Sequence, residues 1–206
     1  MKTRIIRKNY QKKSFIRRFW DFLQEDSWLS WLVSIVLIVF IVRGLFFPAL
    51  SWVTGTSLPL VIVESCSMYH HESSLTDWWA SNKDWYLKKN ITYDEFNSFK
   101  FKGGLNKGDI IFVWGKGPYK IGDIIIFNAG AAHPIIHRMV YDAPIETKGE
   151  SIHNTEQIHI IGGVDETNIN KESIVGKAAL RIPYLGWIKL VFFEPFRTPD
   201  QRGFCS

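Results

Sequence analysis

The chain is poor in several features, and each scarcity excludes a class of protein. Only two cysteines, Cys66 and Cys205, occur in 206 residues, too few for the disulfide framework of a small secreted domain. We expect both thiols to be unpaired. Only one long apolar run is present, at 28–50, so the chain is not a multi-span membrane protein. With 46% hydrophobic and 22% charged residues, it is not disordered either.

Acidic side chains are absent from the first 20 residues, which hold eight basic ones. The remainder has 17 basic against 20 acidic side chains, a net charge of about −3. The overall charge of +5 therefore belongs to an N-terminal tail and not to a folded face. This distribution argues against nucleic acid as a partner.

The apolar run at 28–50 predicts a membrane anchor. As a helix it would reach roughly 34 Å at about 1.5 Å per residue, enough to cross a bilayer. Its one charge, Arg43, is expected among the headgroups. The polar stretch before it is too long for a cleaved signal peptide, so we expect the anchor to be retained. The positive-inside rule then predicts a cytoplasmic tail at 1–27 and residues 51–206 on the outer face of the cell membrane.

Beyond the anchor, short β-branched runs closed by glycine or proline predict a mainly β, antiparallel domain. The expected strands are Leu60–Glu64, Asp109–Trp114, Asp123–Asn128, Pro134–Tyr141, Gln157–Ile161 and Ser173–Ile182. The segment 185–193 is expected to be a strand or an interfacial segment. An aromatic-rich stretch at about 72–106, with cap signals at Ser74 and Thr92, predicts a small helical insertion whose tryptophans pack on the sheet.

Three ordered stretches carry the chemistry. The first is Ser65-Cys-Ser-Met-Tyr-His70, which follows an apolar strand soon after the anchor. The second is Lys120-Ile-Gly-Asp-Ile-Ile-Ile-Phe127, and the third is Pro134-Ile-Ile-His-Arg-Met-Val140. In order and approximate spacing, the set resembles the motifs of the signal peptidase I family. The later stretches 174–178 and 181–186 also match the closing strands of that family.

The resemblance implies an antiparallel β catalytic domain of the signal-peptidase type, with Ser67 as nucleophile and His137 as general base. Histidine at this position is typical of the archaeal and eukaryotic branch, whereas bacterial enzymes have lysine. A neutral imidazole can take the serine proton at physiological pH. The backbone amide of Ser67 is the first expected oxyanion donor and Ser65 the second, because alternate residues of an extended segment share a face. Met68 aligns with a residue that lies near the membrane surface in that family.

A histidine base usually needs an acceptor that fixes its tautomer. In that family the acceptor comes from a later acidic motif, which this chain matches poorly. Asp165 is our predicted orienting carboxylate and Glu150 the alternative, with Asp142 a weaker third option. A surface role for each of these acids stays open.

Two other chemistries are less favoured. A Cys66–His137 pair is disfavoured because the alternation points Cys66 away from Ser67. His133 and His137 lie four apart in a strand pattern, about 13 Å along the chain, too far to share one zinc ion. No metal and no cofactor are expected.

The resemblance thus implies a membrane-anchored serine endopeptidase that removes N-terminal signal peptides from exported preproteins. The partners of such an enzyme would be those preproteins and membrane lipid. The resemblance is also compatible with association with the protein-export machinery. An inactive membrane-tethered β domain that binds export substrates or partner proteins is the alternative. The altered acidic motif and His70, which stands where the family motif has a proline, favour that alternative, whereas the retained Ser67 and His137 are against it. A serine protease dedicated to one precursor is the third reading.

Overall fold

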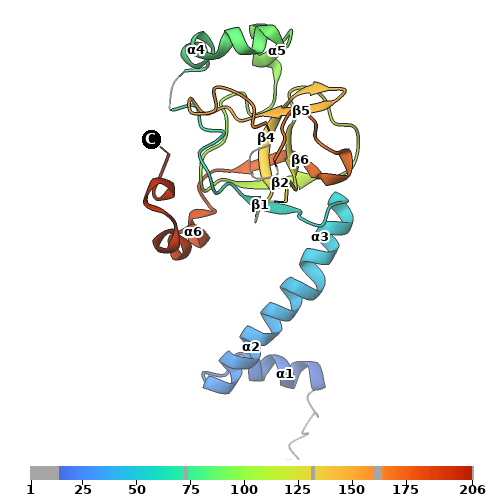
Figure 1. The fold of residues 1–206 in the computed structure, drawn as a ribbon. Coiled ribbons are helices and arrows are strands. Elements are labelled where there is room, and N and C mark those ends of the chain that lie inside the picture. Colours follow the sequence, from blue (N-terminus) through green and yellow to red (C-terminus); the bar gives the residue numbers. More distant parts are fainter. Residues whose placement is uncertain (1–13, 72–73, 131–132, 160–163, 206) are drawn as a thin grey trace, which may run out of the picture. The chain divides into compact units, whose positions relative to one another are not determined.

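A computed structural model describes residues 14–71, 74–130, 133–159 and 164–205. The chain divides into two compact units, Met1–Ala49 and Leu50–Ser206 (Figure 1). The first unit contains helix α1 (Phe15–Leu23) and helix α2 (Trp28–Ile41). The second contains all of the strands and the helices that follow residue 54.

One continuous apolar helix is long enough to cross a membrane. It is built from α2, the π-helical turn η1 (Val42–Phe46) and α3 (Phe47–Thr54), and runs from Trp28 to Thr54. The π-helical turn lies next to Pro48, which lacks the amide hydrogen that an α-helix would direct at Gly44. The predicted apolar span at 28–50 is therefore confirmed as a helix, and this helix continues for four more residues.

The second unit is built on a six-stranded antiparallel sheet, which confirms the mainly β prediction (Figure 1). The strand order is β1-β2-β6-β3-β4-β5. The strands are β1 (Leu60–Ile62), β2 (Ile110–Trp114), β3 (Ile124–Phe127), β4 (Ile135–Asp142), β5 (Ile145–Lys148) and β6 (Ile174–Ile182). The 3-10 turn η2 (Lys171–Ser173) leads into β6.

The strand predictions fail at two places. The sequence did not predict β5, and the described part of the expected strand at 157–161, residues 157–159, is not a strand. The other two residues of that expected strand lie outside the described part of the chain.

The predicted helical insertion contains α4 (Leu75–Lys88) and α5 (Tyr93–Ser98). Each begins at a hydroxyl cap: Ser74 accepts from the amide of Asp77, and Thr92 accepts from the amide of Glu95. Their aromatic side chains are buried against β4, in a cluster made of Trp78, Trp79, Tyr86, Ile91, Phe96 and Val140. The prediction that the tryptophans pack on the sheet is confirmed.

The C-terminal segment contradicts one of the two alternatives predicted for 185–193. Residues 187–193 form helix α6 (Trp187–Phe193) and not a strand, and the interfacial alternative stays a prediction. Two 3-10 turns follow, η3 (Glu194–Phe196) and η4 (Pro199–Gln201). The segment ends at a disulfide bond between Cys66 and Cys205, so the expectation of two unpaired thiols is wrong. The two cysteines are 139 residues apart, and only the folded chain brings them together.

Candidate functional site

The loop after β1 carries the predicted nucleophile and closes onto the opposite edge of the sheet. The carbonyl oxygen of Ser67 accepts two backbone hydrogen bonds, from the amide of Glu150 at 2.7 Å and from the amide of Ser151 at 2.8 Å. Both donors follow β5, whereas the loop itself leaves β1, and these are the two edge strands. Ser67 is therefore fixed by its backbone at the end of the β4–β5 ladder.

The register of that ladder shows which part of β4 lies beside the Ser67 loop. Lys148, the last residue of β5, pairs with Arg138, and Gly149 follows it directly. A Cβ atom on Gly149 would lie 2.9 Å from the Ser67 carbonyl oxygen. The absence of a side chain at Gly149 therefore lets the nucleophile loop approach the end of β5 that lies beside Arg138, the residue after His137.

The Ser67 hydroxyl lies 3.2 Å from the Ser65 hydroxyl, so the prediction that these two side chains share a side is confirmed. In the described part of the chain, no group accepts a hydrogen bond from the Ser67 amide. This amide is therefore available to a ligand. Among the described residues, the Ser67 hydroxyl makes no hydrogen bond with His137.

The carboxylate that binds His137 is Glu166, which the sequence analysis did not select. The Nδ1 atom of the buried imidazole shares a hydrogen bond with Glu166 Oε1. The same carboxylate accepts from the Thr147 hydroxyl at 3.1 Å and from the Ile158 amide at 2.8 Å. Burial alone would raise the pKa of Glu166, but these bonds and the adjacent imidazole lower it below its ordinary value. Glu166 is therefore ionised at neutral pH and oriented toward Nδ1.

Asp165, the predicted orienting acid, points elsewhere. Its Oδ1 accepts from the amide of Thr167 at 2.9 Å and from the hydroxyl of the same residue at 2.7 Å. It also lies 3.3 Å from the exposed ring of His159. The prediction was wrong by one residue, because neighbouring side chains leave the backbone on different sides.

Glu150, the alternative acid, is also not bound to His137. It is fully buried, pairs with Arg138 Nε and lies 2.8 Å from His70 Nε2. Burial would raise the pKa of Glu150, but Arg138 and His70 lower it below its ordinary value. Arg138 follows His137 on β4, so the two side chains point to opposite faces of the sheet. The third option, Asp142, is exposed at the end of β4.

Met68 does not lie on a surface. Its side chain is 0% exposed and packs in a core cluster with Val63, Leu105, Ile111, Ile124 and Ala178. The implied position of this residue near a membrane surface stays a prediction. Met68 holds the loop after Ser67 in the core.

The disulfide bond excludes Cys66 as a thiolate nucleophile while it is intact. The C-terminal segment supports the same loop at other points. Arg197 bonds the carbonyl and the carboxylate of Glu64, at 2.9 and 2.6 Å. The buried ammonium of Lys107 bonds the carbonyls of Gln201 and Gly203, at 2.6 and 2.9 Å. The nucleophile loop is thus braced from both sides, by β5 and by the C-terminal segment.

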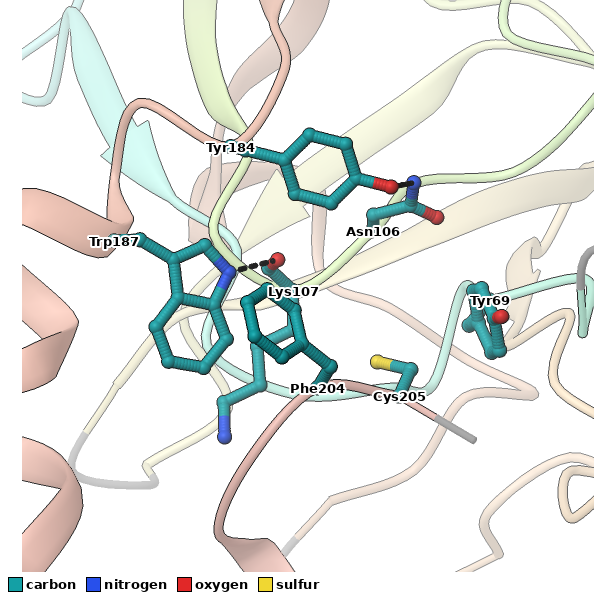
Figure 2. Close-up of a pocket in the computed structure, with 7 residues that line it drawn as sticks. All are labelled: Tyr69, Asn106, Lys107, Tyr184, Trp187, Phe204 and Cys205. Carbon is teal, nitrogen blue, oxygen red and sulfur yellow. Dashed lines mark hydrogen bonds between the residues drawn. The ribbon is translucent and has the colours of Figure 1, made fainter.

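A cavity of about 420 Å³ lies beside this brace (Figure 2). Aromatic rings dominate its lining, which consists of Tyr69, Tyr184, Trp187 and Phe204 together with Asn106, Lys107 and Cys205. Neither Ser67 nor His137 lines it, so the cavity is separate from the candidate active site. Among the described residues, no group of three histidine, cysteine, aspartate or glutamate side chains could hold a metal ion.

Comparison with protein-family models and with curated proteins finds no match for this chain.

Proposed function

We propose that the chain is a membrane-anchored serine endopeptidase of the signal peptidase I type. The observation that carries the proposal is the buried His137–Glu166 pair on the sheet whose edge, together with the C-terminal segment, braces the Ser67 loop. A histidine with Nδ1 held by a carboxylate, together with a serine whose backbone amide has no acceptor among the described residues, supports acyl transfer.

In this proposal, the Ser67 hydroxyl leaves Ser65, turns toward His137 and attacks the scissile carbonyl carbon. His137 Nε2 takes the hydroxyl proton and later gives it to the leaving amine, and water then cleaves the acyl-enzyme by the same route. Among the described residues no group bonds Nε2, so it is open for this transfer. Glu166 stabilises the imidazolium that forms. Catalytic hydrogen bonds are often long or misaligned before substrate binds, which accounts for the absence of a Ser67–His137 hydrogen bond among the described residues.

The oxyanion would be bound by two donors that the loop already presents. The Ser67 amide has no acceptor among the described residues, and the Ser65 hydroxyl lies next to the nucleophile. Each oxyanion donor typically stabilises the transition state by about 3–4 kcal/mol.

The proposed substrates are the N-terminal signal peptides of exported preproteins, cut after a small-x-small sequence. A substrate with its own apolar segment in the bilayer meets an enzyme that a membrane helix holds at the same surface. The Cys66–Cys205 disulfide supports a location of the sheet unit on the outer face, because disulfides persist in oxidising compartments. The basic N-terminal tail supports the same orientation.

The test is cleavage of a reporter preprotein by the detergent-solubilised full chain, read as the appearance of the mature N-terminus. We expect Ser67→Ala and His137→Ala each to lower the rate by roughly 10³-fold or more. The matched controls are Ser81→Ala and His159→Ala, which change exposed residues outside the site. The double variant Cys66→Ala/Cys205→Ala should retain cleavage if its fold survives.

A folded wild-type chain that cuts no preprotein would overturn the proposal. The alternative, a membrane-tethered β domain that binds export substrates, would then be favoured, because the described residues show no hydrogen bond between Ser67 and His137. A retained rate in Ser67→Ala would instead require another nucleophile.

A further inference from the structure

Helix α1 (Phe15–Leu23) separates apolar and charged side chains onto two faces. At about 100° per residue, its six apolar residues fall within an arc of roughly 160°. The other three, Arg17, Arg18 and Asp21, occupy the opposite side. Such a complete separation of apolar and charged side chains in nine residues is typical of a helix that lies in a lipid–water interface.

The apolar face is exposed along most of its length. The exposed fractions are 82% for Phe15, 77% for Ile16 and 61% for Trp20. None of the helix residues is buried. Large apolar side chains gathered on one face need a partner that removes them from water.

The position of α1 in the chain identifies that partner. Only residues 24–27 separate it from the membrane-length helix, which begins at Trp28. The helical path is broken there: α1 ends at Leu23, with Gln24 as its C-cap, and Ser27 caps a new helix by accepting from the Ser30 amide. Figure 1 draws α1 across the end of α2 and not in line with it. The helix is therefore held beside a bilayer but is not part of the span.

Charge favours an anionic lipid surface. Residues 1–27 hold eight basic side chains against three acidic ones, Asp21, Glu25 and Asp26. Arg17 and Arg18 lie on the polar face of α1, where both are exposed. An interfacial helix with this arrangement has its guanidinium groups level with the lipid phosphates while its aromatic rings enter the acyl boundary.

We propose that α1 is an interfacial helix that binds the anionic phospholipids of the leaflet on the N-terminal side of the anchor. Phe15, Ile16 and Trp20 enter the membrane, and Arg17 and Arg18 contact lipid phosphates. This interaction does not depend on the proposed peptidase activity.

The test uses the oxidised full chain in vesicles, where the native cysteines are paired and do not react with thiol labels. Nitroxide labels are attached singly to Phe15→Cys, Ile16→Cys and Arg17→Cys, with Ser81→Cys on α4 as a water-exposed control. The measured quantity is the ratio of accessibility to oxygen over accessibility to a water-soluble nickel chelate. The vesicles contain phosphatidylcholine alone or with added phosphatidylglycerol.

With phosphatidylglycerol present, we expect the ratio at positions 15 and 16 to exceed that at positions 17 and 81 by about threefold or more. Omission of phosphatidylglycerol, or the double change Arg17→Gln/Arg18→Gln, should reduce this difference. Equal ratios at positions 15, 16 and 81 would overturn the proposal. So would a difference that is independent of phosphatidylglycerol and of both arginines. If labels on both faces were shielded from both reagents, a protein and not a lipid would cover α1, and the proposal would also be wrong.

Discussion

Among the described residues, two buried histidine–glutamate pairs lie in the sheet unit, His137–Glu166 and His70–Glu150, and an arginine joins only the second. Arg138 bonds Glu150 and three backbone carbonyls, those of Lys100, Phe101 and Gly122. The ring of His70 is stacked on Trp78 with centroids 4.1 Å apart and an angle of 2°. This second pair is a fixed, charge-compensated cluster.

In the first pair, His137–Glu166, the other donors to the carboxylate are neutral groups. Glu166 receives hydrogen bonds from Thr147 and Ile158 but has no cationic partner other than His137 among the described residues. A proton that arrives on His137 would therefore complete an ion pair. We infer that the groups around the carboxylate distinguish a candidate base from a structural histidine. Glu150 is bonded by an arginine, whereas Glu166 is bonded by neutral donors and by the imidazole. Four predictions test this distinction.

The largest expected effect is on catalysis. Glu166→Gln keeps the shape of the side chain but removes the charge that stabilises the imidazolium, so reporter cleavage should fall by roughly 10³–10⁴-fold. Asp165→Asn is the matched control, because Asp165 bonds Thr167 and not His137. If Asp165→Asn reduced cleavage as strongly, the assignment of Glu166 would be wrong.

The second prediction concerns stability. Glu150→Gln leaves the Arg138 guanidinium, which is 0% exposed, without its carboxylate. The free energy of unfolding should fall by about 3–5 kcal/mol, measured by denaturant titration in detergent. Glu156→Gln, which changes an exposed glutamate bonded to Trp85, should cost less than about 0.5 kcal/mol. Comparable losses in the two variants would contradict a structural role for the Arg138 cluster.

A smaller loss is expected for the histidine of that cluster. His70→Phe can retain the stacking on Trp78 but loses the bond to Glu150, so the unfolding free energy should fall by about 1–3 kcal/mol. The folded variant should still cut the reporter, because His70 has no proton-transfer role. His159→Gln, at an exposed pair, serves as control. A folded but inactive His70→Phe would remove the distinction between the two histidines.

The last prediction concerns the stability of the folded chain at acidic pH. The pKa values of Glu150 and Glu166 are both below the ordinary value of 4.5. A depressed pKa in the folded state contributes stability that is present above the unfolded-state pKa and is lost as the pH falls through the folded-state pKa. Stability should therefore decrease below about pH 4.5, and Glu166→Gln should reduce that slope by at most about 1.4 kcal/mol per pH unit. Unfolding titrations across this range measure both slopes, and an unchanged slope in Glu166→Gln would contradict the shift.

Much of the fold could be predicted because its strands follow a simple rule. β1, β2, β3, β4 and β6 are apolar runs closed by turn residues, and each lies within a range that the sequence indicates, except that β4 ends one residue later, at Asp142. β5 could not be found in this way. It reads Ile-Glu-Thr-Lys, and its polar side chains are buried through hydrogen bonds and ion pairs and not through apolar packing.

Two residues of the candidate site, Ser67 and His137, could be selected from the sequence, but the orienting acid could not. Ser67 and His137 stand in ordered motifs, whereas the orienting acid depends on which of two adjacent side chains turns toward β4. No sequence pattern sets that direction in the segment around Asp165 and Glu166. The Cys66–Cys205 bond was missed for a related reason, since its partners meet only through the path of the C-terminal segment. Helix α1 had a readable signal, a strict division of apolar and charged residues at helical spacing.

In the proposed mechanism, Ser67 is a nucleophile activated by His137 and Glu166. The most direct test of this mechanism is labelling of the full-length chain with a peptide diphenyl phosphonate, followed by mass spectrometry to locate the adduct. The account predicts one adduct on Ser67, absent in Ser67→Ala and formed far more slowly in His137→Ala and Glu166→Gln. An adduct on another residue, or no adduct on the folded wild-type chain, would contradict it.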